Sequence, residues 1–216
     1  MFRRKKEKVP AVVEKMDKIA VGLDIGTTKI AVCVGQRNKE GNIELMGSGE
    51  HISLGVQRGQ VINIVKTVEA IKYAIKQAVA SSGVTIDTVV GGIAGQHINS
   101  FHAEGEIKRR DADSEVTKED VKMLVEDMFK ISVKPGVQII DAIPQEFFVD
   151  DYNDLKDPIG VLGTQLGSVF NIITGNSQHI KNIARCIQKC NLKMEGLVLE
   201  PIASAEVVLD EKEKES

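Results

Sequence analysis

Short apolar runs alternate with small polar residues over the first part of the chain. Apolar residues dominate 19–25 and 29–36, and a third run, 43–52, follows the Glu-Gly-Asn triplet at 40–42. Runs of this length, bounded by residues that favour turns, are typical of β-strands. The pattern therefore predicts three consecutive strands, and the last two form a hairpin.

A helical period follows these strands. Apolar residues recur three or four positions apart over 65–79, and the Ser-Gly pair at 82–83 is a stop signal. The next segment, 86–94 (IDTVVGGIA), is apolar throughout and predicts a buried strand. Its two adjacent glycines indicate that another part of the chain comes close there.

From residue 101 the predicted order is strand, helix, strand, strand. FHAEGEIKR alternates like an exposed strand, and Thr117 can cap a helix because an acid, Asp120, stands three residues on. Strands at 137–149 and 166–174 follow, separated by an acidic loop. The helix should pack on these strands through one apolar stripe, formed by Val121, Leu124, Val125, Met128 and Phe129.

The last part of the chain predicts helix, strand, helix. An amphipathic helix starts near 176–177, a buried strand covers 196–199, and a second helix starts at Pro201. Proline suits the first turn of a helix because its missing N–H would have no partner there.

Composition limits the possible functions. The chain has 216 residues, 42% hydrophobic and 27% charged, which is ordinary for a globular protein. A net charge of −3 and the absence of Trp argue against nucleic-acid binding. No apolar run approaches the roughly 20 residues that span a bilayer, and the basic N-terminus lacks the apolar core of a signal peptide. These features predict a cytoplasmic protein.

The turn after the first strand carries the candidate chemistry. In VGLDIGTTKI, Asp24 stands near the end of the strand, Gly26 allows close approach, and Thr27, Thr28 and Lys29 supply donors. Such a concavity suits the oxygens of a phosphate. A carboxylate beside a phosphate is repulsive unless a cation lies between them, so Asp24 indicates Mg²⁺ held through water. The alternative is a plain β-hairpin, and this segment alone leaves both open.

The longer pattern is similar to a known family. The stretches that carry the similarity are VGLDIGTTKI, GVQRGQVINIVKTVEAIKYAI, VVGGIAGQHI, AIPQEFFVD, KDPIGVLG and LVLEPIASA, which cover most of 19–209. Together they resemble the FtsA family, the bacterial cell-division actin homologues of the actin-like ATPase superfamily. The resemblance implies an α/β fold: an actin-like (ribonuclease H-like) first lobe with a mixed β-sheet and helices, plus an inserted strand-helix-strand-strand subdomain.

The resemblance also implies a domain organisation. Residues 1–18 would form a charged, flexible leader, and 19–100 the first part of lobe one. Residues 101–175 would be the FtsA-specific inserted subdomain, after which 176–200 return to lobe one. Residues 201–216 would start the connection to a second lobe. Because the family pattern continues with a second phosphate loop of the DIGGGT type, we expect the chain to be an N-terminal fragment.

What the resemblance implies about function concerns the full-length protein. It would bind ATP and Mg²⁺ through the turn from Asp24 to Lys29, with Glu200 where related ATPases place an acid near the metal and the attacking water. It would be at most a weak ATPase, and the fragment inactive.

The resemblance further implies partners and a location. The full-length protein would polymerise at the division septum, on the cytoplasmic face of the inner membrane. It would link FtsZ to the membrane through the second lobe and a C-terminal tail, while the inserted subdomain serves self-association and contact with later division proteins. The alternative is a small-molecule kinase of the same superfamily. That activity would need a carboxylate base aimed at a substrate hydroxyl, and no such constellation is evident before residue 200.

Overall fold

The computed structural model describes residues 19–109, 113–210 and 213. The leader predicted for 1–18 and most of the tail therefore lie outside the described residues.

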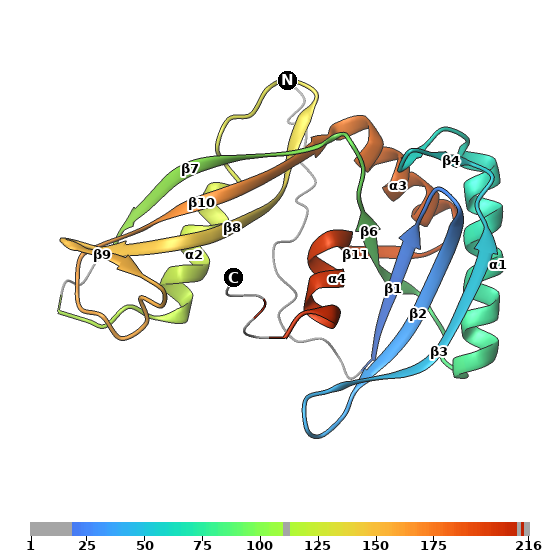
Figure 1. Ribbon diagram of the computed structural model, residues 1–216, viewed down its shortest axis with the longest axis horizontal. Coiled ribbons are helices and arrows are strands. Elements are labelled where there is room, and N and C mark those ends of the chain that lie inside the picture. Colours follow the sequence, from blue (N-terminus) through green and yellow to red (C-terminus); the bar gives the residue numbers. More distant parts are fainter. Residues whose placement is uncertain (1–18, 110–112, 211–212, 214–216) are drawn as a thin grey trace, which may run out of the picture. The chain divides into compact units, whose positions relative to one another are not determined.

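The chain divides into two compact units, which are described separately (Figure 1). Unit 1 consists of the described residues within Met1–His97 and Gln178–Ser216, and unit 2 of those within Ile98–Ser177. Unit 1 combines a β-sheet with several helices and unit 2 a β-sheet with helix α2 (Lys118–Met128), so the α/β class predicted from the sequence is present in both.

The sheet of unit 1 has five strands in the order β11-β6-β1-β2-β3. The predicted meander is present as β1 (Ile19–Ile25), β2 (Lys29–Arg37) and β3 (Ile43–Ile52), each antiparallel to the next. On the other side of β1 lie β6 (Thr88–Ile93) and β11 (Lys193–Leu199), parallel to it and to each other. Because β1, β6 and β11 run in the same direction, their carboxyl ends meet at one edge, which is where open α/β sheets place ligands.

Helix α1 (Ile64–Ser82) lies along β3 (Figure 1). It begins where the Asn63 side chain accepts a hydrogen bond from the Lys66 N–H, and it ends at Gly83, whose φ of 71° is left-handed. The predicted Ser-Gly stop is therefore confirmed. Small side chains let the helix approach the sheet closely, and its buried residues are Thr67, Ala70, Ile71, Ala74 and Ala78.

Two further helices belong to the later part of the chain. Helix α3 (Ser177–Lys189) buries Ile180 and Ile183 together with Cys186 and Ile187, as its amphipathic pattern predicts. Helix α4 (Glu200–Val208) follows β11 directly, with Pro201 in its first turn.

A small hairpin in unit 1 was missed by the sequence pattern. It consists of β4 (Val56–Gln57) and β5 (Gln60–Val61), joined by Arg58 (φ 51°) and Gly59 (φ 74°). Two successive residues with positive φ are the signature of the two-residue turn that matches strand twist. Strands of two residues are too short to show an alternating pattern, and the Arg-Gly pair was the only local signal.

Unit 2 contains an antiparallel sheet in the order β7-β10-β8-β9. Its strands are β7 (Ile98–Lys108), β8 (Val137–Val149), β9 (Tyr152–Leu155) and β10 (Gln165–Asn176). The short β9 lies in the segment that the sequence predicted as an acidic loop. It forms because Asp150, with a φ of 48°, turns the chain back so that β9 pairs with the end of β8.

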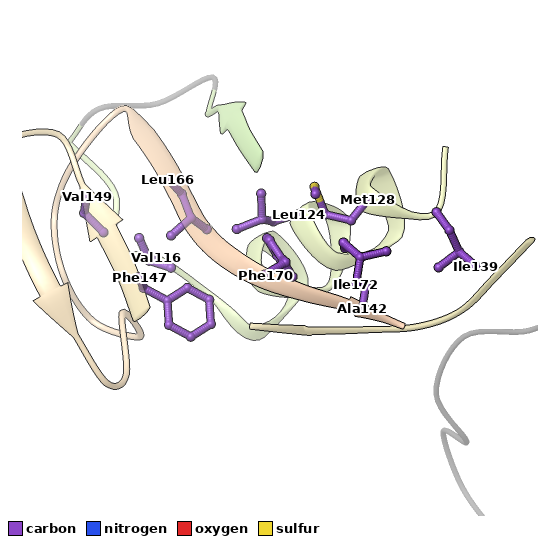
Figure 2. Packing of buried hydrophobic residues seen from close by; sticks show 10 residues of the cluster. All are labelled: Val116, Leu124, Met128, Ile139, Ala142, Phe147, Val149, Leu166, Phe170 and Ile172. Carbon is purple, nitrogen blue, oxygen red and sulfur yellow. The ribbon is translucent and has the colours of Figure 1, made fainter. Parts of the chain in front are cut away.

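Helix α2 (Lys118–Met128) covers one face of this sheet. The predicted capping box is confirmed, since Thr117 accepts from the Asp120 N–H and the Asp120 carboxylate accepts from the Thr117 N–H. Leu124 and Met128 are fully buried against the strands (Figure 2). The other three residues of the predicted apolar stripe pack against this core but are only partly buried: Val121, Val125 and Phe129. Phe129 follows the last residue of the helix, Met128.

Beside α2 the guanidinium of Arg109 is buried, with 5% of its side chain exposed. Its Nε donates to Asp120 Oδ2 (3.2 Å), and Nη1 to the carbonyl oxygens of Ser114 (2.9 Å) and Gly163 (2.6 Å). Its Nη2 donates to Ser114 Oγ (3.0 Å) and the Glu115 carbonyl oxygen (2.6 Å). Burial opposes ionisation of Asp120, but the hydrogen bonds from the capping threonine and the charge of Arg109 outweigh it and lower its pKa. One side chain thus joins the end of β7 to two loops and the start of α2.

Candidate functional site

The turn between β1 and β2 holds the predicted phosphate-binding residues. Asp24 is the penultimate residue of β1, opposite Ala31 of β2, and is half-buried. Gly26 follows the strand, and a Cβ there would lie 2.8 Å from the Lys29 carbonyl oxygen and 3.5 Å from Asp24 Oδ1. The hairpin's own backbone therefore already requires glycine at this position.

The two threonines of the turn are exposed and anchor it to neighbouring segments. Thr27 Oγ1 accepts from the Gly59 N–H of the small hairpin at 3.0 Å. The Thr28 carbonyl oxygen accepts from the Ser53 N–H, also at 3.0 Å. Since Thr27 Oγ1 acts as an acceptor there, its O–H proton remains available to a ligand.

Lys29 is directed to the neighbouring strand. Its Nζ lies 3.0 Å from Glu50 Oε2 of β3, with both side chains more than half exposed. The hydrogen bond and the charge of Glu50 raise the pKa of Lys29. Because such an exposed ion pair is weak, Lys29 can exchange it for another anion at little cost.

Glu200 comes to the same edge of the sheet from β11. It is the first residue of α4, where the partial positive charge of a helix N-terminus favours a carboxylate. Gly92 of β6 gives it room, since a Cβ at that glycine would lie 3.1 Å from Glu200 Cγ. The sequence indicated close approach at the paired glycines, and the structure shows that the approaching group is this side chain.

Asp24 and Glu200 thus form a carboxyl pair from β1 and α4. Asp24 Oδ1 is buried and has no hydrogen-bond partner among the described residues. Burial, above all, raises the pKa of Asp24, against the opposing effects of Glu200 and Lys29. The pKa of Glu200 is also raised, by burial and by the negative charge of Asp24.

The donor set of this pair fits a hydrated divalent cation. Two neighbouring carboxyls with raised pKa values and one buried acceptor oxygen are the electrostatic arrangement that a cation relieves. In the described part of the chain, no three His, Cys, Asp or Glu side chains gather as a metal site. Mg²⁺ commonly keeps several waters and takes only one or two carboxylates, so the pair suffices for it.

The structure brings Asp24, Gly26, Thr27 and Glu200 to one edge, while the ammonium of Lys29 lies over β3. Sequence reasoning gave no role to Gly59, which fixes the turn through Thr27. In the sequence, the Arg58-Gly59 pair indicated a turn at this position but not its contact with Thr27.

Known proteins are similar both to unit 2 by itself and to most of the chain. A family profile described as "SHS2 domain inserted in FTSA" matches residues 95–174. The chain is 36% identical over 203 residues to cell division protein FtsA of Neisseria meningitidis serogroup B, covering 94% of this chain and 49% of that protein. It is 31% identical over 198 residues to cell division protein FtsA of Escherichia coli K12, covering 92% and 47% respectively. The chain spans about half the length of the curated relatives it matches.

Among solved structures, the chain resembles one from the PilM-PilN type IV pilus biogenesis complex. The TM-score is 0.58 at 12% sequence identity, over 87% of this chain and 49% of that one. At this identity the similarity concerns the fold alone, and it confirms the actin-like α/β class expected from the sequence. With the sequence similarity to the curated relatives and the matched inserted domain, the chain belongs to the FtsA family of bacterial cell-division proteins.

Proposed function

We propose that this chain forms part of an ATP-dependent cell-division scaffold. The observation that carries the proposal is the similarity, over 94% of the chain, to a protein named cell division protein FtsA. The same similarity disfavours the alternative of a small-molecule kinase. In the whole protein the scaffold polymerises at the division septum, on the cytoplasmic face of the inner membrane.

The nucleotide part of the proposal rests on the carboxyl pair and the turn beside it. Asp24 holds Mg²⁺ through water, with Glu200 next to it, and the O–H of Thr27 and the backbone N–H groups of the turn face the phosphates. Bound MgATP would supply a triphosphate whose charge the cation offsets. The chain's own residues orient that charge at the carboxyl edge of the sheet, where β1, β6 and β11 end.

The partner part of the proposal assigns contacts to different regions. Unit 2 serves self-association and contact with later division proteins, and its match to a domain inserted in this family supports that role. We assign the link to FtsZ and to the membrane to the rest of the whole protein, since this chain spans 49% of the length of such a relative. None of the helices in the described residues is long and apolar enough to span a bilayer.

Depletion in the bacterium that carries the gene tests this function. We expect long, undivided cells, and we expect the whole protein fused to a fluorescent protein to form bands at mid-cell. A whole protein carrying Asp24→Ala should form fewer bands at equal abundance. Normal division after depletion would overturn the proposal.

A further inference from the structure

Strand β7 is a long, regular edge of the unit 2 sheet. Its residues 98–108 pair with 165–175 of β10 without a register shift, whereas the β8–β10 pairing contains two shifts. Among the described strands, β7 pairs with no other neighbour. It contains neither proline nor a bulge, the usual devices that block an edge. Alternate backbone N–H and C=O groups of β7 therefore point away from the sheet.

One face of this edge is acidic. Gly105 points toward Met128 of α2, so its neighbours Glu104 and Glu106 lie on the opposite face, and both are exposed. Glu104 and Glu146 both stand opposite Val169 of β10, which places a third carboxylate in the same row. The side chains that flank this group along β7 on the same face are His102 and Lys108.

The other face of the edge opens into a groove of about 830 Å³ beside α2. Ile107 of β7 and Met123 of α2 line it, and Met123 is 52% exposed. Glu126, Asp127 and Lys130 stand around it. An apolar side chain that entered from an added strand would therefore cover apolar surface here, as strand-addition sites generally provide pockets for alternate side chains.

Charge disfavours the central registers of a second copy of this strand, while a register centred on 107 would set Glu106 opposite Lys108 and leave Glu104 outside the ion pairs. In an antiparallel pair of two β7 strands, a register centred on position 104, 105 or 106 sets Glu104 or Glu106 opposite a glutamate of the other copy. Like charges directly opposite each other destabilise a strand pair. A strand with basic residues at alternate positions would instead place opposite charges there.

We propose that the β7 edge binds, by strand addition, an extended segment of a partner protein in which basic residues alternate with apolar ones. The basic side chains face Glu104 and Glu106, and an apolar side chain enters the groove lined by Ile107 and Met123. This inference deepens the proposed contact role of unit 2 and rests on it.

Fluorescence anisotropy with synthetic peptides tests the proposal on the 216-residue chain. The probe is a labelled peptide as long as β7, eleven residues, in which Lys alternates with Val and Thr. One comparison peptide has the same composition with its lysines grouped at one end, and another has proline at its centre. The charge-reversed variant is Glu104→Lys/Glu106→Lys. Its matched control is Glu40→Lys/Glu69→Lys, which changes the net charge equally at exposed positions of unit 1.

The alternating peptide should bind, and each comparison peptide should bind at least about tenfold more weakly. The variant at the edge should lose at least about tenfold in affinity, and the matched control less than about twofold. If the grouped peptide bound as tightly as the alternating one, charge alone would explain the attraction and the proposal would be overturned. It would also be overturned if the alternating peptide did not bind, or if Glu104→Lys/Glu106→Lys bound that peptide with unchanged affinity. Mid-cell localisation in the depletion experiment does not use this peptide, so failure here is distinguishable from failure of the proposed function.

Discussion

Replacing Arg109 with methionine removes a buried guanidinium while keeping most of the aliphatic bulk of the side chain. Three backbone carbonyl oxygens then each lose one hydrogen bond, those of Ser114, Glu115 and Gly163. Asp120 loses its ion-pair partner but keeps the hydrogen bonds of the helix cap. The two loops would then be joined by backbone hydrogen bonds alone, such as those from the Val116 N–H to the Val161 carbonyl oxygen and from the Gly160 N–H to the Val116 carbonyl oxygen.

The expected loss of stability follows from these groups. A buried acceptor that loses its donor costs about 1–3 kcal/mol, and the low end applies because Ser114 and Glu115 line an open groove that water can enter. Three such oxygens give about 3 kcal/mol, at the lower limit of what breaking a buried ion pair costs. Arg109→Lys should recover only part of this, because an ammonium cannot reproduce the planar fork of donors.

Urea denaturation followed by circular dichroism measures the effect, with Lys108→Met at the exposed neighbouring position as the matched control. The control should stay within about 0.5 kcal/mol of the parent chain. The pKa of Asp120 is lowered from 3.8 in the folded chain, so its ionised form stabilises the fold above that pH and this contribution is lost on acidification. The gap between parent and Arg109→Met should therefore narrow as the pH falls. A loss below about 1 kcal/mol at neutral pH would refute the reasoning.

Three further predictions concern the two units. Leu124→Ala should lower the free energy of unfolding by about 2–5 kcal/mol, because the side chain is fully buried. Thermal denaturation should show a smaller loss of stability for Phe129→Ala, because Phe129 is only partly buried. A larger loss for Phe129→Ala would mean that α2 packs on the sheet differently. Glu200→Gln should stabilise the chain at pH 7, because a raised pKa makes ionisation of this carboxyl in the folded state unfavourable. That gain should shrink as the pH falls from 7 toward 4.5, because Glu200 takes up its proton in the folded state above 4.5, and a gain independent of pH would exclude titration as its cause. Gly26→Ala should cost about 1–3 kcal/mol, since its Cβ meets the Lys29 carbonyl oxygen, and an unchanged melting temperature would show that the turn can shift.

Elements with a strong period could be predicted from the sequence because local pattern decides them. The strands at 19–25, 43–52 and 137–149 have the predicted bounds. The helix that begins after Thr117 is capped as predicted. The short strands β4, β5 and β9 could not be found this way, because two to four residues show no alternation.

The candidate site was predictable in its residue types and less so in its contacts. Asp24 and Glu200 are far apart in sequence, and only the parallel order of the strands brings them to one edge. The ion pair between Lys29 and Glu50 depends on the register of β2 and β3. Lys29 stands directly opposite Ile52, and Glu50 is two residues before Ile52 on the same strand. Arg109 was not singled out from the sequence, because a buried arginine is recognised only when its acceptors converge from separate loops.

Calorimetric titration of the whole protein with ATP, with and without Mg²⁺, tests the central claim that the carboxyl pair at this edge is part of a nucleotide site. We expect the parent protein to bind ATP more tightly when Mg²⁺ is present, and Asp24→Asn to remove most of this dependence on Mg²⁺ while the protein stays folded. Tight binding that is equally dependent on Mg²⁺ in parent and Asp24→Asn would contradict it, because the cation would then be held elsewhere.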